Sequence, residues 1–166
     1  MIRIVTESMS DFTQEESKAA DLIVMPLPIR FGMEEYWDDG VSLTQDDFYA
    51  RLRVAKELPK TSQVPVEHYR KCFNRLLENQ EDEVLVITGS SKLSGCYQSA
   101  CIAREACHDP ARVTVLDSLN ATCAEYMLVD QALRYRREGV SDMQTMLAKL
   151  RDVMAPVSYT HLRAHE

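Results

Sequence analysis

Short apolar runs that alternate with longer amphipathic stretches constrain the fold of this chain more than any other feature of its sequence. Three runs of strand type cover residues 2–6, 84–88 and 113–116, and stretches with helical periodicity separate them. Strands that alternate with helices predict an α/β fold, in which a parallel sheet carries helices on both faces. The expected helices cover residues 13–20, 44–54, 66–79, 95–107, 121–137 and 141–153.

Capping residues and prolines place several of the element boundaries. Thr13 and Thr44 are each followed by acidic residues, as is typical of a helix N-cap. Residues 22–31 have strand character, but two prolines within them cannot donate to a sheet ladder. Part of this strand should therefore lie at a sheet edge or bend away from it. A polar segment, residues 60–63, lies between two further prolines and is expected to be a loop.

Charge and hydropathy exclude several classes of protein. The 166 residues include 19 Lys and Arg and 26 Asp and Glu, which gives a formal net charge of −7. The basic residues are dispersed, so the basic stripe of a nucleic-acid-binding protein is missing and we expect no such partner. The longest apolar stretches, residues 22–27 and 84–87, are far shorter than the ~20 residues that span a bilayer, and we find no apolar signal-peptide segment. We therefore expect a cytoplasmic protein.

The cysteines and histidines do not show the spacing of a metal site. Five cysteines are an odd number and contain no C-x-x-C pair, and the four histidines contain no H-x-x-x-H pair. A disulfide framework would require paired cysteines in a secreted chain. The sequence therefore predicts reduced thiols and no metal.

Hydroxyl side chains cluster where the predicted strands end. Thr6 and Ser8 follow the first strand, residues 88–91 follow the second, and Ser118 follows the third. Because the carboxyl ends of parallel strands meet at one edge of a sheet, these residues should line one polar crevice. Residues 90–99 also open a helix, whose first backbone N–H groups stabilise an anion. The sequence therefore predicts a site for a phosphate or a carboxylate group.

Catalytic motifs fit this segment poorly. Five residues separate Gly89 from Gly95 and Cys96 follows, so the P-loop spacing is not met, and the G-x-S-x-G pattern is absent. Cys96 lies at a helix start, where a thiol can become nucleophilic, but the sequence places no histidine beside it. The alternative to a binding protein is a small-molecule hydrolase or transferase on a Rossmann-like sheet. Its nucleophile would be Ser94 or Cys96, with Asp117 as the orienting group.

Seven motifs, in order, resemble those of the DegV family of bacterial fatty-acid-binding proteins. The resemblance covers residues 2–153, and two of its motifs, residues 59–63 and 90–100, are long enough that agreement in the right order and spacing is not due to chance. The matching segments are residues 4–8 (IVTES), 25–27 (MPL) with 31–32 (FG), 36–40 (YWDDG), 48–49 (FY), 59–63 (PKTSQ), 90–100 (SSKLSGCYQSA) and 117–118 (DS).

The resemblance implies a lipid carrier that is not an enzyme and has no cofactor. It implies that one long-chain fatty acid binds between an N-terminal α/β domain and a C-terminal domain. A partner fatty-acid kinase would phosphorylate the carboxylate, and the acyl phosphate would enter phospholipid synthesis, with transient membrane contact as a further option. The carboxylate contacts carried over from the family are Thr61 and Ser94, and Ser62, Ser91 and Gly95 are further candidates.

The chain departs from the family pattern at several places. The usual Thr-Asp-Ser reads Thr6-Glu7-Ser8, the usual Gly-Thr-Tyr reads Gly95-Cys96-Tyr97, and residues 120–125 (NATCAE) replace a glycine-rich stretch. We expect residues 1–155 to form the N-terminal domain and residues 156–166 to be a cloning or frame-shift artefact. The C-terminal domain is expected to be absent. An apolar face without its partner domain predicts self-association.

Overall fold

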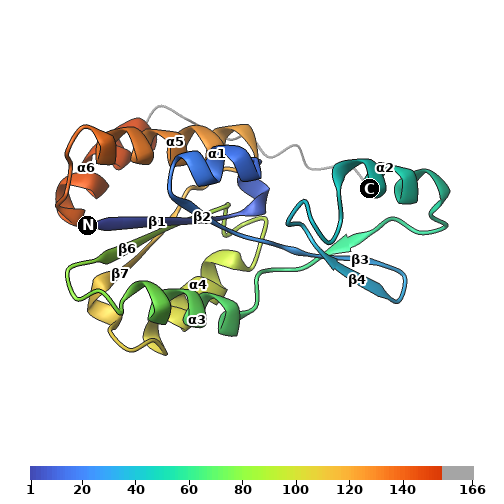
Figure 1. Ribbon diagram of the computed structural model, residues 1–166, viewed down its shortest axis with the longest axis horizontal. Helices are drawn as coiled ribbons and strands as arrows, with labels where there is room; N and C mark the ends of the chain where they lie inside the picture. Colours follow the sequence, from blue (N-terminus) through green and yellow to red (C-terminus); the bar gives the residue numbers. More distant parts are fainter. Residues whose placement is uncertain (155–166) are drawn as a thin grey trace.

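The computed structural model describes residues 1–154 and shows an α/β fold built on a four-stranded parallel sheet (Figure 1). Its strands are β1 (Ile2–Glu7), β2 (Leu22–Met25), β6 (Glu83–Thr88) and β7 (Val113–Asp117), in the order β2-β1-β6-β7. Every neighbouring pair is parallel, and Ile4 pairs with both Leu22 and Leu85. The prediction of a parallel sheet is confirmed, whereas the expectation for residues 156–166 falls outside the described residues.

Helices cover both faces of this sheet, as the sequence predicts (Figure 1). Alternate side chains of β1 and β6 point to opposite faces, so each strand contributes buried apolar residues to both faces of the sheet. Val5 and Val86 pack in one core with α3 (Val66–Leu76) and α4 (Cys96–Glu105). Ile4 and Ile87 pack in a second core with α5 (Cys123–Arg137) and α6 (Met143–Met154).

Side-chain caps explain where several helices begin. Thr13 and Glu16 form a complete capping box before α1 (Gln14–Ala19). The Thr44 hydroxyl accepts from the Asp47 amide at the start of α2 (Gln45–Val54). Before α6 the cap is Asp142, whose carboxylate accepts from the Thr145 amide at 2.7 Å. Short 3₁₀ turns, η1 (Ser8–Ser10) and η2 (Pro110–Arg112), complete the described elements.

A second, antiparallel sheet departs from the sequence prediction. It has the order β4-β3-β5 and contains β3 (Pro28–Phe31), β4 (Glu34–Trp37) and β5 (Lys60–Thr61). The prolines end β2 and turn the chain into β3, so the predicted bend of residues 22–31 is confirmed. The expectation of a loop over residues 60–63 is wrong in part, because Thr61 pairs with Ile29. This pairing joins residues far apart in the sequence, and local patterns do not reveal it.

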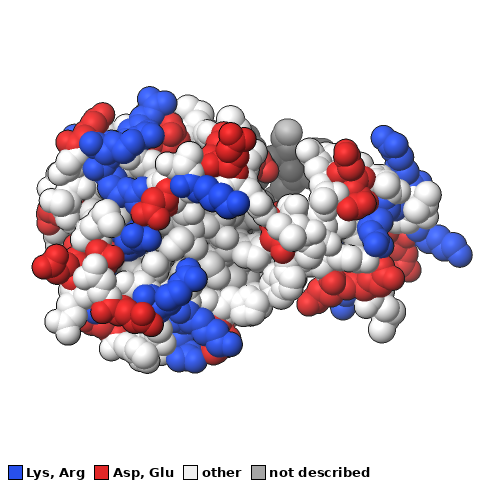
Figure 2. Space-filling model, viewed as in Figure 1, with Lys and Arg blue, Asp and Glu red and all other residues white. Residues whose placement is uncertain are grey.

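The second sheet and α2 extend from the side where the parallel strands end (Figure 1). The chain passes from β2 into β3 and returns through β5 to α3, so two segments connect the two parts. Lys and Arg side chains are interspersed with Asp and Glu over the face in Figure 2, without a continuous basic stripe on that face. The carboxyl edge of the parallel sheet therefore faces β5, and the candidate site lies between them.

Candidate functional site

A crevice of about 390 Å³ lies between the carboxyl edge of the parallel sheet and the second sheet. Its walls come from the turn after β1, the connection from β2 to β3, the segment after β4, the segment that includes β5, the loop before α4, and the residue before α5. The lining residues are Ser8, Met9, Asp11, Leu27, Asp38, Thr61, Ser62, Gln63, Leu93, Ser94, Gly95 and Thr122.

The structure brings together four of the five predicted ligand-binding residues. Thr61, Ser62, Ser94 and Gly95 all line the crevice. Ser91 is not among the lining residues; its amide donates to the Asp117 carboxylate at 3.2 Å. Asp117 and Ser118 do not line it either, so the third strand exit contributes less than the sequence suggests. The role of these four residues as ligand contacts remains a prediction.

The loop before α4 uses most of its backbone amides internally. Those from Gly89 to Ser94 all donate to acceptors within the protein, at distances between 2.7 and 3.3 Å. The Cys96 amide donates to the Ser94 hydroxyl at 3.2 Å. Among residues 1–154 the Gly95 amide has no recorded acceptor, and it belongs to the crevice lining. Of the backbone amides expected to bind an anion at this helix start, only that of Gly95 is therefore available in the crevice. Other hydrogen bonds to a ligand have to come from side chains such as hydroxyl groups.

The hydroxyl donors have few competing partners in the described chain. No side-chain hydrogen bond of Thr61 or Ser62 is found among residues 1–154, whereas the Ser94 hydroxyl accepts from the Cys96 amide and also interacts with the Cys96 thiol. The Thr61 backbone is held by pairing with Ile29 in the second sheet. Three hydroxyl groups therefore meet at one crevice, two from β5 and the residue after it and one from the loop before α4.

The Gln63 side chain packs directly against Gly95. A Cβ atom at Gly95 would lie 3.1 Å from Cδ of Gln63 and 3.3 Å from its Oε1. Such contacts are tighter than ordinary van der Waals distances, so a larger residue would displace the Gln63 side chain. The glycine thus brings the loop before α4 against the segment that follows β5.

Two aspartates are the charged residues of the lining. Asp11 and Asp38 belong to different segments, and no Lys, Arg or His lies among the described lining residues. Burial, together with the nearby Asp38, raises the pKa of the Asp11 carboxyl group. The lining of the crevice therefore combines neutral donors with two acidic acceptors.

A buried pair of carboxyl groups lies behind the crevice, and the sequence analysis did not identify it. Glu7 and Glu125 are both 0 % exposed and both approach Gly89. Glu7 accepts from the Gly89 amide at 2.7 Å and from the Tyr69 hydroxyl at 3.3 Å. Glu125 accepts from the Thr6 hydroxyl at 3.1 Å, and its second oxygen has no recorded partner.

Burial is the main cause of the unusual acidity of this pair. It raises the pKa of Glu7 to about 7 and that of Glu125 to about 9, and in Glu125 the nearby Glu7 adds to the shift. The sequence contained one indication that Glu125 is buried. Glu125 occupies the same face of α5 as Leu128, Val129 and Ala132, which are buried at helical spacing.

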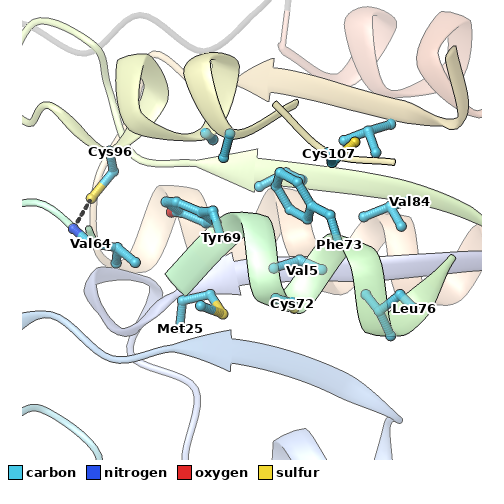
Figure 3. Close-up of a cluster of buried hydrophobic side chains, with 14 of the residues drawn as sticks. Val5, Met25, Val64, Tyr69, Cys72, Phe73, Leu76, Val84, Cys96 and Cys107 are labelled. Atoms are coloured by element: carbon cyan, nitrogen blue, oxygen red, sulfur yellow. Dashed lines mark hydrogen bonds between the residues drawn. The ribbon is translucent and has the colours of Figure 1, made fainter. Parts of the chain in front are cut away.

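The geometry gives little support to the nucleophile alternative. Cys96 is fully buried, and its sulfur accepts from the Val64 amide at 3.4 Å (Figure 3). Burial raises the pKa of the Cys96 thiol, which opposes formation of a reactive thiolate. Of the histidines in the described part, His68 packs against Trp37 with tilted rings, and neither it nor His108 lines the crevice. Asp117 accepts from the Ser91 and Leu119 amides and does not orient a base in this geometry.

Residues 1–154 contain neither a candidate metal centre nor a candidate membrane-spanning helix. No group of three or more His, Cys, Asp or Glu side chains in residues 1–154 is arranged to hold a metal ion. Within the same residues, no helix combines the length and apolar character needed to cross a bilayer.

Comparison with known proteins establishes the family. A model of the DegV family matches residues 1–161. The chain belongs to the DegV family. A DegV domain-containing protein of Caldanaerobacter subterraneus is 36 % identical over 97 % of this chain and 58 % of its own length. The chain spans about half the length of the curated relatives it matches.

Solved DegV structures share the fold and have names that refer to fatty acids. A fatty-acid-binding DegV family protein from Thermus thermophilus matches with a TM-score of 0.82 and 31 % identity, over 92 % of this chain and 53 % of the other. A stearic acid-binding protein from Eubacterium ventriosum matches with the same score and identity, over 91 % of this chain and 52 % of the other. The α/β fold of this chain is thus the fold of DegV fatty-acid-binding proteins.

Proposed function

We propose that this chain belongs to a fatty-acid carrier and holds the carboxyl group of a long-chain fatty acid in the crevice. The observation that carries the proposal is the convergence of hydrogen-bond donors from two separate segments, the hydroxyls of Thr61, Ser62 and Ser94 and the Gly95 amide. Hydroxyl and amide donors match the oxygen atoms of a carboxyl group. The names of the related structures favour the same ligand class. Ser91 is left out because it does not line the crevice.

Apolar side chains beside the donors suit the start of an acyl chain. Met9, Leu27 and Leu93 line the same crevice, and Leu93 is half exposed at its rim. Burial of one CH₂ group contributes about 0.8 kcal/mol, so the acyl chain supplies most of the affinity and the hydroxyls orient the head group. The part of the acyl chain beyond the rim would need a wall from elsewhere in the whole protein.

The position of the donors also suits transfer chemistry at the carboxyl group by a partner. Thr61, Ser62 and Gly95 are exposed at the surface, so a bound head group stays within reach of another protein. We propose that a partner fatty-acid kinase phosphorylates the carboxyl group and that the acyl phosphate serves phospholipid synthesis. The chain itself has the role of a carrier and not of an enzyme. The five free cysteines favour the reducing cytoplasm as its location.

Displacement of a fluorescent fatty acid by stearic acid tests the head-group assignment. Thr61→Ala and Ser94→Ala each remove one hydrogen bond, and we expect affinity to fall about five- to tenfold in each variant. Ser91→Ala is the matched control, because Ser91 lies in the same loop but outside the crevice, and its affinity should equal that of the parent. Equal affinity of both lining variants and the parent would contradict the assignment.

A further inference from the structure

Gln63 is a polar residue of the crevice to which no role has been given so far. It follows Thr61 and Ser62 directly in the chain and lines the same crevice. Among the described lining residues its side chain is the only one with N–H donors, since the others are Ser, Thr, Asp, Met, Leu and Gly. A carboxamide has two N–H donors and no charge. Gln63 can therefore offer two further hydrogen bonds to the oxygen atoms of a ligand.

The Gln63 side chain lies where the two donor segments meet. A Cβ atom at Gly95 would lie 3.1 Å from Cδ, 3.3 Å from Oε1 and 3.4 Å from Cβ of Gln63. The side chain therefore packs over Gly95 along its length, from Cβ to the carboxamide. Gly95 also has the one lining amide without a recorded acceptor among residues 1–154. The Gln63 carboxamide and this amide thus share one corner of the crevice.

Hydrogen bonds of its two neighbours fix the backbone at Gln63. The Ser62 amide donates to the carbonyl of Pro28 in β3 at 3.2 Å. The Val64 amide donates to the sulfur of the buried Cys96 at 3.4 Å, and Figure 3 shows this bond as a dashed line. Cys96 is the first residue of α4. The backbone around Gln63 is therefore anchored to the second sheet through one neighbour and to α4 through the other.

The Gln63 carboxamide is available to a ligand. It forms no hydrogen bond with another residue in the part of the chain that the structure describes, and Gln63 is exposed. Another glutamine of the same surface region is used differently, because the Gln14 side chain donates to the Asp39 carbonyl. A ligand at Gln63 therefore displaces water and breaks no contact within the described protein.

We propose that Gln63 is a further ligand-binding residue of this site and that its side-chain amide donates to the carboxyl group of the fatty acid. The inference rests on the proposed function and identifies a residue that favours a carboxylate over an uncharged head group. No Lys, Arg or His lies among the described lining residues, so neutral donors have to offset the desolvation of a carboxylate. A carboxylate accepts at two oxygens, whereas an alcohol has only one and gains less from the two N–H groups.

Two substitutions at Gln63 separate hydrogen bonding from packing. Gln63→Met keeps an unbranched side chain that can pack over Gly95 but removes both N–H donors. Gln63→Glu keeps the shape of the side chain and replaces the donors by a negative charge, which repels a carboxylate. Because Gln63 is exposed, both variants should fold as the parent does. Gln98→Glu is the matched control for charge, because Gln98 is exposed on α4 and does not line the crevice.

The experiment is isothermal titration calorimetry of this chain with dodecanoic acid and with 1-dodecanol at neutral pH. Gln63→Met should lower the affinity for dodecanoic acid about five- to tenfold. Gln63→Glu should lower it at least about tenfold and leave the affinity for 1-dodecanol within about twofold of the parent value. Gln98→Glu should leave both affinities unchanged.

The outcomes distinguish the inference from the proposed function. If Gln63→Met binds dodecanoic acid as tightly as the parent does, the inference is wrong and the proposed function stands. Equal losses for the acid and the alcohol in Gln63→Glu also overturn the inference, because they would show that Gln63 only maintains the shape of the crevice. If the parent binds no dodecanoic acid, the proposed function fails and the inference fails with it.

Discussion

Glu7 and Glu125 hold two carboxyl groups in the protein interior without a cationic partner among the described residues. Both are 0 % exposed, and neither forms an ion pair with a Lys, Arg or His. An isolated buried carboxylate is costly, so the proton remains bound in the folded state to a higher pH than in the unfolded chain. The pair therefore couples the stability of this fold to pH.

Glu125→Gln should make the protein less sensitive to alkaline pH. The folded pKa of Glu125 is raised to about 9, so its contribution to stability is complete below the unfolded pKa and is lost as pH rises towards 9. Glutamine cannot ionise and keeps an oxygen that can accept from Thr6. We expect the free energy of unfolding of the variant, relative to that of the parent, to rise by about 1.4 kcal/mol for each pH unit between about 5 and 9.

Urea unfolding at a series of pH values measures this difference. Glu138→Gln is a suitable control, because Glu138 is an exposed residue at the end of the same helix. Parallel stability curves for Glu125→Gln and the parent across this range would show that Glu125 ionises as an ordinary carboxyl group.

The crevice and the acid pair show which residues can be predicted from a sequence alone. Thr61, Ser62, Ser94 and Gly95 lie in two motifs that resemble those of the DegV family, so the sequence alone identified them as candidates. In the structure all four line one crevice. Glu125 carries no motif, and only its position on an apolar helix face signals burial. Burial of a polar residue depends on contacts from distant segments, which local patterns do not contain.

Among the elements, α1 depends strongly on its cap because it has only six residues, none of them buried. The Thr13 hydroxyl accepts from the Glu16 amide at 3.2 Å, and Glu16 accepts from the Thr13 amide at 2.9 Å. Glu16 also accepts from the Tyr126 hydroxyl at 3.1 Å, which links α1 to α5. Short helices are marginal by themselves, so these contacts hold α1 in place.

Thr13→Ala should lower the free energy of unfolding by about 1 kcal/mol. The variant loses the hydroxyl that accepts from the Glu16 amide and donates to the Glu16 carboxylate, while the backbone amide of residue 13 can still donate to that carboxylate. Thermal unfolding followed by circular dichroism should show a midpoint about 2–4 °C lower. Thr13→Ser retains the hydroxyl and should behave like the parent. A Thr13→Ala variant as stable as the Thr13→Ser variant would mean that the cap does not support α1.

Elements with strong local signals were predicted well, and those that rely on distant pairing were not. Capping residues and helical periodicity located α1, α2 and α3 close to their observed bounds. The residues of β4 are mostly charged or aromatic and were not recognised as a strand. The two residues of β5 become a strand only because β3 lies beside them. Tertiary contact decides such short strands, so the second sheet was missed.

At the scale of the whole molecule, large apolar side chains are exposed near the carboxyl edge of the parallel sheet. Leu119 is 50 % exposed and Met127 is 65 % exposed. Met127 also lines an apolar hollow of about 70 Å³ with Ala124, Leu128 and Val153. Leu119 adopts a left-handed conformation with φ 57°, which is uncommon for leucine. Both side chains leave apolar area open to association with another surface.

Self-association of this chain should therefore depend on these side chains. The double substitution Leu119→Asn and Met127→Lys removes two apolar groups, and asparagine fits the left-handed backbone better than leucine does. In sedimentation equilibrium we expect the parent to self-associate. The dissociation constant of the double variant should be at least about tenfold higher than that of the parent. Ile102→Gln is the control, because Ile102 is 46 % exposed on α4 and lies outside this apolar surface. If the parent sediments as a monomer and binds no hydrophobic dye, Leu119 and Met127 do not mediate self-association.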